Sequence, residues 1–223
     1  VEVLPAVTFT DNKKRITKYV AAMTLANVYL QQGKFAEAAT YSKMVVNSAH
    51  GLTANDDLKM NSAYNKLRKT DDLAESIYAY EFDGAINSSG WWTTYAFNGS
   101  ATAVFDKYSI FERVYGPTKR FLNVYKADDL RIQPNQFFHW EYKNPNTGKV
   151  WKSDDAGVWY FVDESALLNT GRGTKDWNIY RYAEALLIAA ESTAKASNAV
   201  TAEAAGYLAR IKARASTTNK TVA

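Results

Sequence analysis

The residues best suited to chemistry in this chain are aromatic and lie close together. Trp91 and Trp92 are adjacent, and Tyr95 and Asn98 follow within a few residues. Indole and phenol rings offer flat apolar faces on which the C–H face of a sugar can stack, and an amide can bond hydroxyl groups. Neighbouring side chains of a strand point to opposite faces, so one indole would be buried and the other exposed. The group predicts a sugar-binding platform, or else the anchor of an irregular loop.

A second aromatic set lies between residues 136 and 163. Aromatic and polar residues alternate there on both sides of Asn144-Pro-Asn-Thr-Gly148, a pattern typical of a β-hairpin with its turn at 146–148. Cross-strand pairing would account for these rings without a ligand. We nevertheless take Trp140 and Tyr142 as candidate ligand contacts. The full set is Trp140, Tyr142, Trp151, Trp159 and Tyr160.

Catalytic groups are not arranged in a recognisable way. Glycoside hydrolysis needs two carboxylates at a set separation across a cleft, which sequence adjacency does not provide. His50 and His139 are far apart and have no ligand-spaced partner, so we expect polar surface or loop positions for both. We therefore expect no enzymatic activity, no metal site and no cofactor. The acidic residues considered were Asp128, Asp129, Asp154, Asp155, Asp163 and Glu164.

Composition narrows the functional class further. The chain has 223 residues, enough for one large domain or two small ones. It has no cysteine, which excludes disulfides and thiolate chemistry. Its 27 basic and 23 acidic residues are spread along the chain, whereas a nucleic-acid binder usually gathers basic residues on one face. No stretch of about 18 apolar residues is present, so no membrane-spanning helix is expected. We expect no nucleic-acid partner.

A helix hairpin is predicted over residues 11–50. Apolar residues recur at helical spacing from 13 to 32 and again from 35 to 47, and Thr10 or Asp11 is suited to cap the first helix. The spacing of Tyr29, Gly33 and Ala38 is that of a tetratricopeptide repeat. Tyr29 would fill the groove between the helices, Gly33 would permit the turn, and Ala38 would allow close approach.

A second helix hairpin is predicted over residues 177–216, with helices at 177–196 and 201–215. Asp176 and Thr201 are suited to cap these two helices. Arg181 and Glu184 are interpreted as structural, with Glu184 bonded either to Arg181 or to a neighbouring helix.

Residues 51–176 lie between the two hairpins and are rich in loops and aromatic residues. Short helices are predicted near 57–68 and 117–125, a strand at 75–80, a long loop at 83–107 and the β-hairpin at 136–163. The whole chain is thus expected to form one mostly α domain. Its tetratricopeptide-like helix hairpins would flank a long irregular insertion that holds a short β-hairpin.

The order of several segments resembles the SusD/RagB family of outer-membrane nutrient-uptake lipoproteins. No one segment is decisive, but the order is fairly specific, with the Arg-Tyr-Ala-Glu helix placed before the Arg-x-Arg-Ala helix. The segments are Arg15-Ile-Thr-Lys-Tyr-Val-Ala-Ala, Leu25 to Tyr29, Gly33-Lys-Phe-Ala-Glu-Ala38, Glu75-Ser-Ile-Tyr, Gly116-Pro-Thr, Asp128-Asp-Leu-Arg131, Arg181-Tyr-Ala-Glu-Ala-Leu-Leu187 and Leu208-Ala-Arg-Ile-Lys-Ala-Arg-Ala215.

The resemblance implies a surface-exposed lipoprotein of the cell outer membrane. Such a protein covers a SusC-like TonB-dependent transporter, captures oligosaccharide or polysaccharide without catalysis, and delivers it for import. The resemblance also implies that binding aromatics lie in loops after the Glu75-Ser-Ile-Tyr strand, where Trp91 and Trp92 stand. Family members are longer at both ends, so we interpret the chain as an internal fragment, with membrane contact only through a lipid anchor outside it.

Two other functions fit the same sequence. In the RagB branch the scaffold captures peptide, which predicts a more charged or elongated pocket and no affinity for glycans. A tetratricopeptide-type interaction module would instead grip a partner peptide in a concave groove. That module would need three or more consecutive repeats, whereas only two separated hairpins are predicted here.

Overall fold

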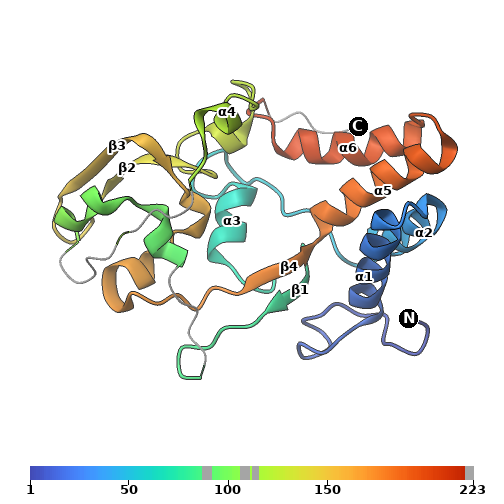
Figure 1. Cartoon of the computed structure of the whole chain (residues 1–223). Helices are drawn as coiled ribbons and strands as arrows, with labels where there is room; N and C mark the ends of the chain where they lie inside the picture. The colour runs from blue at the N-terminus through green and yellow to red at the C-terminus, as the bar shows by residue number, and fades with distance from the viewer. Residues whose placement is uncertain (87–91, 106–110, 112–115, 219–223) are drawn as a thin grey trace.

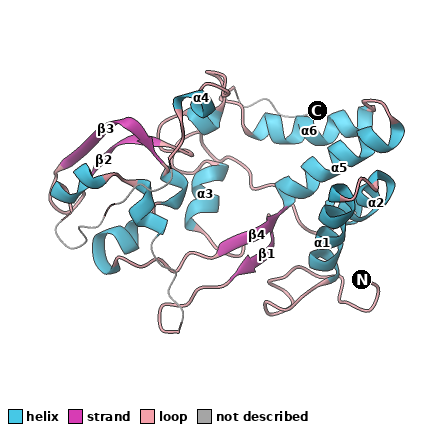
Figure 2. Ribbon diagram, in the orientation of Figure 1, coloured by secondary structure: helices cyan, strands magenta, loops and turns pink. Residues whose placement is uncertain are grey.

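The structure is a computed structural model that describes residues 1–86, 92–105, 111 and 116–218. The helix hairpins gather at one end of the molecule, and a lobe with a β-hairpin forms the other end (Figure 1). A short two-stranded sheet and a central helix lie between them. The chain is rich in helix, as expected, and the elements of residues 51–176 are short and joined by long loops (Figure 2). No helix in the described ranges is long and apolar enough to cross a membrane.

The first helix hairpin consists of α1 (Lys18–Gln31) and α2 (Phe35–Val46). Gly33 makes the turn with a φ of +72°, a conformation that side chains disfavour, so its predicted role is confirmed. The predicted beginning of α1 was wrong. The backbone forms turns before Lys18, and the Thr17 side chain caps the helix by accepting from the Val20 N–H. Asn12 closes those turns by donating to the carbonyls of Arg15 and Ile16.

The second hairpin consists of α5 (Tyr182–Ser197) and α6 (Ala202–Arg214). Thr201 caps α6, as predicted, by accepting from the Ala204 N–H at 3.1 Å. Helix α5 packs against both α2 and α6, so the two hairpins form one layered unit. Small side chains at the interface permit close approach, since Ala22, Ala26, Ala185 and Ala189 are fully buried. Bulkier residues fill the rest of this core: Met23, Val45, Ile77, Tyr182 and Leu186.

The predicted start of α5 was also wrong, because residues 177–181 form a strand. Strand β4 (Trp177–Arg181) pairs antiparallel with β1 (Ser76–Tyr80), with Tyr80 opposite Trp177. Asp176 does not cap the helix, and its carboxylate instead accepts from the Phe82 N–H at 2.9 Å. Pairing with a distant strand therefore decides the structure of this segment. The chain passes directly from β4 into α5.

A buried ion cluster joins the central sheet to the helices. Glu75 is fully buried just before β1 and contacts Arg181 at 3.1 Å and Arg214 at 2.5 Å. Its second oxygen also accepts from the Thr53 N–H at 2.8 Å. Four distant parts of the chain meet at this one carboxylate. Glu184 does not pair with Arg181, since it accepts from Asn27 of α1 at 3.3 Å.

The insertion carries the predicted β-hairpin. Strand β2 (His139–Lys143) pairs antiparallel with β3 (Val150–Gly157), and Gly148 turns the chain with a φ of +73°. Helices α3 (Ala63–Lys69) and α4 (Lys119–Leu122) are shorter than predicted. In the described part of the insertion, the 3-10 turns are Trp92–Ala96 (η1), Gly99–Ala103 (η2), Leu130–Ile132 (η3) and Trp159–Phe161 (η4), and Ala166–Thr170 (η5) is a π turn. Turn η2 contacts β3, and η4 contacts α3 and η1.

An aromatic core holds this lobe together, and His139 lies in it. His139 has no exposed surface and belongs to β2, so the expectation of a surface or loop position was wrong for it; His50 is in a loop, as that expectation allowed, but is buried there. The His139 ring lies 4.8 Å from Phe97 and 5.1 Å from Trp151, centroid to centroid. Its Nε2 is hydrogen-bonded to the Ala96 carbonyl at 2.8 Å. Burial lowers the pKa of this imidazole to about 4.

Gly157 permits the close approach of the hairpin to η1. A Cβ atom at this position would lie 2.1 Å from the Ala96 carbonyl oxygen and 2.4 Å from Nε2 of His139. No side chain fits in that space, so the missing Cβ allows the histidine, the hairpin and η1 to pack together.

Candidate functional site

A cavity of about 250 Å³ lies where β4 begins, between the central sheet and the segment 160–163. The Phe161 and Trp177 rings line it and are stacked, with centroids 5.8 Å apart and planes 27° from parallel. Trp177 is 36% exposed, so part of its indole remains accessible beside the cavity. A flat apolar surface of this kind suits the C–H face of a sugar ring.

Polar groups line the same cavity beside the two rings. Asn178 accepts from the Ser76 hydroxyl through its amide oxygen at 2.6 Å, which leaves its amide nitrogen without an acceptor among the described residues. Arg181 is held by Glu75 and is about one third exposed. Burial raises the pKa of the Tyr160 hydroxyl, which keeps that group neutral and able to donate. The lining thus combines aromatic faces with fixed donors, as small-molecule sites commonly do.

Thr93 fixes the loop that carries the predicted tryptophans to the wall of this cavity. Its hydroxyl donates to the Phe161 carbonyl at 3.1 Å and accepts from the Asp163 N–H at 3.0 Å. Trp91 lies outside the described residues, and so does the side chain of Trp92. The backbone of Trp92 opens η1 and is followed by Thr93, which lines the cavity. Binding by Trp91 and Trp92 stays a prediction.

The other predicted residues belong to the β-hairpin lobe, and none of them lines this cavity. Asn98 donates to the Ser153 hydroxyl at 3.0 Å and accepts from the Ser100 N–H at 3.1 Å, so both ends of its amide have partners in the fold. Tyr142 is 6% exposed in the aromatic core, and burial raises the pKa of its hydroxyl to about 12. Trp140 on β2 and Tyr95 in η1 are half-buried. A binding role for these four residues stays a prediction.

Phe161 and Trp177 were not among the candidate site residues predicted from the sequence. Trp177 fell within a predicted helix, where its neighbours suggested packing and not a strand. The run Trp177-Asn-Ile-Tyr-Arg181 does contain a strand signal, since three of its five residues are aromatic or β-branched. Phe161 carried no such signal, because only the fold brings it beside Trp177.

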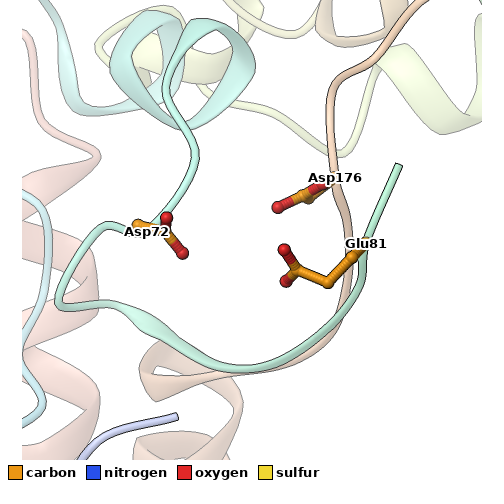
Figure 3. A group of neighbouring side chains, drawn as sticks. All are labelled: Asp72, Glu81 and Asp176. Atoms are coloured by element: carbon orange, nitrogen blue, oxygen red, sulfur yellow. The ribbon is translucent and has the colours of Figure 1, made fainter. Parts of the chain in front are cut away.

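Three carboxylates near the cavity form a separate cluster. Oxygen atoms of Asp72, Glu81 and Asp176 lie within 4.8 Å of one another (Figure 3). Lys14 already pairs with Asp72, and its Nζ lies 3.2 Å from Glu81. Burial, with the charges of Asp71 and Glu81, raises the pKa of Asp176 to about 6. The cluster is a local ion-pair group that ties the N-terminal turns to the central sheet.

A sequence model described as the SusD family matches residues 94–223, more than half of the chain. The chain belongs to the SusD family. SusD-like protein P2 of Formosa agariphila is 28% identical over 224 aligned positions, which cover 89% of this chain and 41% of that protein. The family assignment inferred from the ordered segments is therefore confirmed.

Solved structures share the SusD fold. A SusD superfamily protein from Parabacteroides distasonis is 23% identical, with a TM-score of 0.76 over 95% of this chain and 46% of that one. Surface glycan-binding protein A from Bacteroides thetaiotaomicron, in complex with laminarihexaose, is 17% identical, with a TM-score of 0.67 over 99% of this chain and 52% of that one. The chain spans about half the length of these relatives, and the predicted fold class is confirmed.

Proposed function

We propose that this SusD-family chain captures oligosaccharide at the cavity beside Phe161 and Trp177 and does not transform it. The observation that carries the proposal is the stacked, partly exposed pair of rings next to fixed polar groups. Sugar rings combine apolar C–H faces with hydroxyl groups, and this lining offers a partner for each. The laminarihexaose complex of a protein with the same fold supports the choice of ligand class.

The proposal extends to where the protein acts. The captured glycan would pass to a SusC-like TonB-dependent transporter, with the chain belonging to a surface-exposed lipoprotein of the outer membrane. Family membership supports this arrangement. Co-purification of the transporter with the intact protein from outer-membrane fractions tests it, and recovery of the protein without any such transporter would contradict it.

Replacing Trp177 by alanine is expected to weaken oligosaccharide binding by about tenfold or more, since a buried aromatic contact contributes roughly 1.5–3 kcal/mol. Calorimetric titration against a panel of soluble oligosaccharides measures the loss. Phe121→Ala is a matched control, because this ring is 48% exposed on α4 and does not line the cavity. Equal affinities for Trp177→Ala, Phe121→Ala and the unmodified chain would exclude the cavity as the site.

The double variant Trp91→Ala, Trp92→Ala tests the residues predicted from sequence. Thr93, the next residue, is bonded to the cavity wall. We therefore expect the double variant to bind oligosaccharide about tenfold more weakly than the unmodified chain, because aromatic contact is lost. Thermal melting of the variant separates lost binding from lost folding. Binding to peptides but to no glycan, in the unmodified chain, would favour the RagB-like function instead.

A further inference from the structure

A second cavity of about 580 Å³ adjoins the first and has a different character. The two cavities share part of their lining, including Arg68, Asp163 and Lys175. The first has aromatic walls, whereas charged side chains dominate the second. A ligand on the Phe161–Trp177 stack would therefore extend directly into a charged environment.

The second cavity is lined by more cationic side chains than carboxylates. Its cationic side chains are Arg68, Lys69, Arg172 and Lys175, and its carboxylates are Asp71, Asp163 and Glu164. Asp71 is already paired with Lys175 and also accepts from the Asp176 N–H at 3.1 Å. Asp163 accepts from the Ala166 N–H at 3.0 Å. Lys175 and Arg68 are in turn the ion-pair partners of Asp71 and Glu164, so the lining has a net excess of one positive charge.

Arg68 is the most unusual group in this lining. Its side chain is only 2% exposed, and the guanidinium lies 4.6 Å from the centre of the Trp159 ring. Nε donates to Asn65 at 3.2 Å, and Nη1 donates to the Val162 carbonyl. These contacts hold the guanidinium plane in one orientation at the boundary of both cavities.

The Nη2 nitrogen of Arg68 is buried, and no acceptor among the described residues lies within hydrogen-bond distance of it. Glu164 pairs with this nitrogen at a longer distance, with Oε2 at 3.6 Å, and the Glu164 side chain is 42% exposed. Leaving a buried charged donor unbonded is costly, so an acceptor that completed its bonding would be favoured. Guanidinium groups match the paired oxygens of carboxylates and sulfates particularly well.

We propose that the glycan taken by this chain is anionic and carries a carboxylate or sulfate group. This inference rests on the proposed function. The sugar ring stacks on Phe161 and Trp177, and the anionic group enters the second cavity toward Nη2 of Arg68. The anion would take the place of Glu164 beside Nη2, and the Glu164 side chain is exposed enough to be hydrated instead. Lys69 and Arg172 at the rim attract the same charge.

The test compares each anionic glycan with a neutral form of the same backbone. Oligogalacturonate is titrated beside its methyl ester, and sulfated oligosaccharides beside their desulfated forms, with laminarihexaose as a neutral reference. We expect at least one acidic glycan to bind tenfold or more tightly than its neutral form, with the advantage falling as salt is raised. The two arms distinguish carboxylate from sulfate as the recognised group.

Charge-removing variants locate the effect. Lys69→Gln with Arg172→Gln changes two exposed side chains of the rim and is expected to reduce the affinity for the acidic glycan about tenfold. Lys34→Gln with Lys149→Gln removes the same charge outside both cavities and is expected to have no effect. Arg68→Lys keeps the positive charge but loses the planar guanidinium group. Thermal melting of this variant shows whether it is still folded.

The outcomes separate the two proposals. Equal binding of acidic and neutral forms, or binding of neutral glycans alone, overturns the anionic specificity and leaves glycan capture standing. Equal losses in the rim variant and in the control variant also overturn it, because the effect would then be a general one of net charge. Absence of binding to every glycan overturns the proposed function together with this inference.

Discussion

Replacing Glu75 by alanine is expected to lower the free energy of unfolding by about 3–5 kcal/mol, the usual cost of removing one partner from a buried ion pair. The variant would leave Arg181 and Arg214 facing each other without their shared carboxylate. It would also remove the acceptor of the Thr53 N–H. Urea denaturation followed by far-ultraviolet circular dichroism measures the change.

The control for this experiment is Glu37→Ala, which removes an exposed carboxylate from α2. Its effect is expected to stay within about 0.5 kcal/mol, as for most surface changes. A second variant, Glu75→Leu with Arg181→Met and Arg214→Met, replaces the ion cluster by apolar side chains. We expect it to recover part of the lost stability, since no charge is then left unpaired. A loss for Glu75→Ala no larger than that for Glu37→Ala would contradict our account of the cluster.

Acidification is expected to destabilise the chain through His139 by about 3 kcal/mol, because each tenfold difference in proton affinity between the folded and unfolded chain is worth about 1.4 kcal/mol. Burial lowers the pKa of the folded imidazole from 6.5 to about 4. Between these two values the unfolded chain binds the proton more tightly than the folded chain. Stability is therefore lost as pH falls from about 6.5 to about 4, and the loss from this residue stops below that.

His139→Gln isolates this contribution, because the readout is the pH dependence and not the stability at one pH. Denaturation curves at pH 7, 5.5 and 4 are compared between the unmodified chain and the variant, and the variant should show the smaller decline. Asp176 acts in the opposite direction, since its pKa is raised to about 6 and its effect favours the folded state at lower pH. The contribution of Asp176 is the same in both chains, so it cancels when their pH dependences are compared. An unchanged pH dependence in His139→Gln would refute the expectation.

Local signals allowed much of the scaffold to be predicted from the sequence. The turn at Gly33, the cap at Thr201 and the β-hairpin turn at Gly148 each depend on residues near one another in the chain. The errors arose where distant segments decide the structure. Residues 177–181 are a strand because β1 pairs with them, and His139 is buried because η1 and the hairpin enclose it.

Some features of the candidate site could likewise be predicted from local sequence, and others depend on distant segments. The sequence indicated the aromatic loop after β1, and Thr93 ties that loop to the cavity. The pairing of Phe161 with Trp177 could not be predicted, because sixteen positions separate them and only the central sheet brings them together. The orientation of Arg68 depends on its contacts with Asn65, Trp159 and Val162. Two of these residues are distant in sequence, so no local pattern predicts the orientation.

The segments that revealed the family prove to be structural. Glu75, Arg181 and Arg214 come from three of the quoted segments, and they meet in one buried ion cluster. Such a signature identifies how the chain is held together. The nature of the ligand has to be sought in other residues, chiefly those between β1 and β4.

The missing side chain of Gly157 also bears on the thermodynamics of binding. Because the hairpin, His139 and η1 are packed without space for even a methyl group, these parts have few alternative arrangements to lose when a ligand arrives. Association is weakened whenever flexible groups must be ordered, so this part of the protein contributes little to that entropic cost. Because η1 carries Thr93 of the cavity wall, this tight packing favours affinity before any contact with the ligand is made.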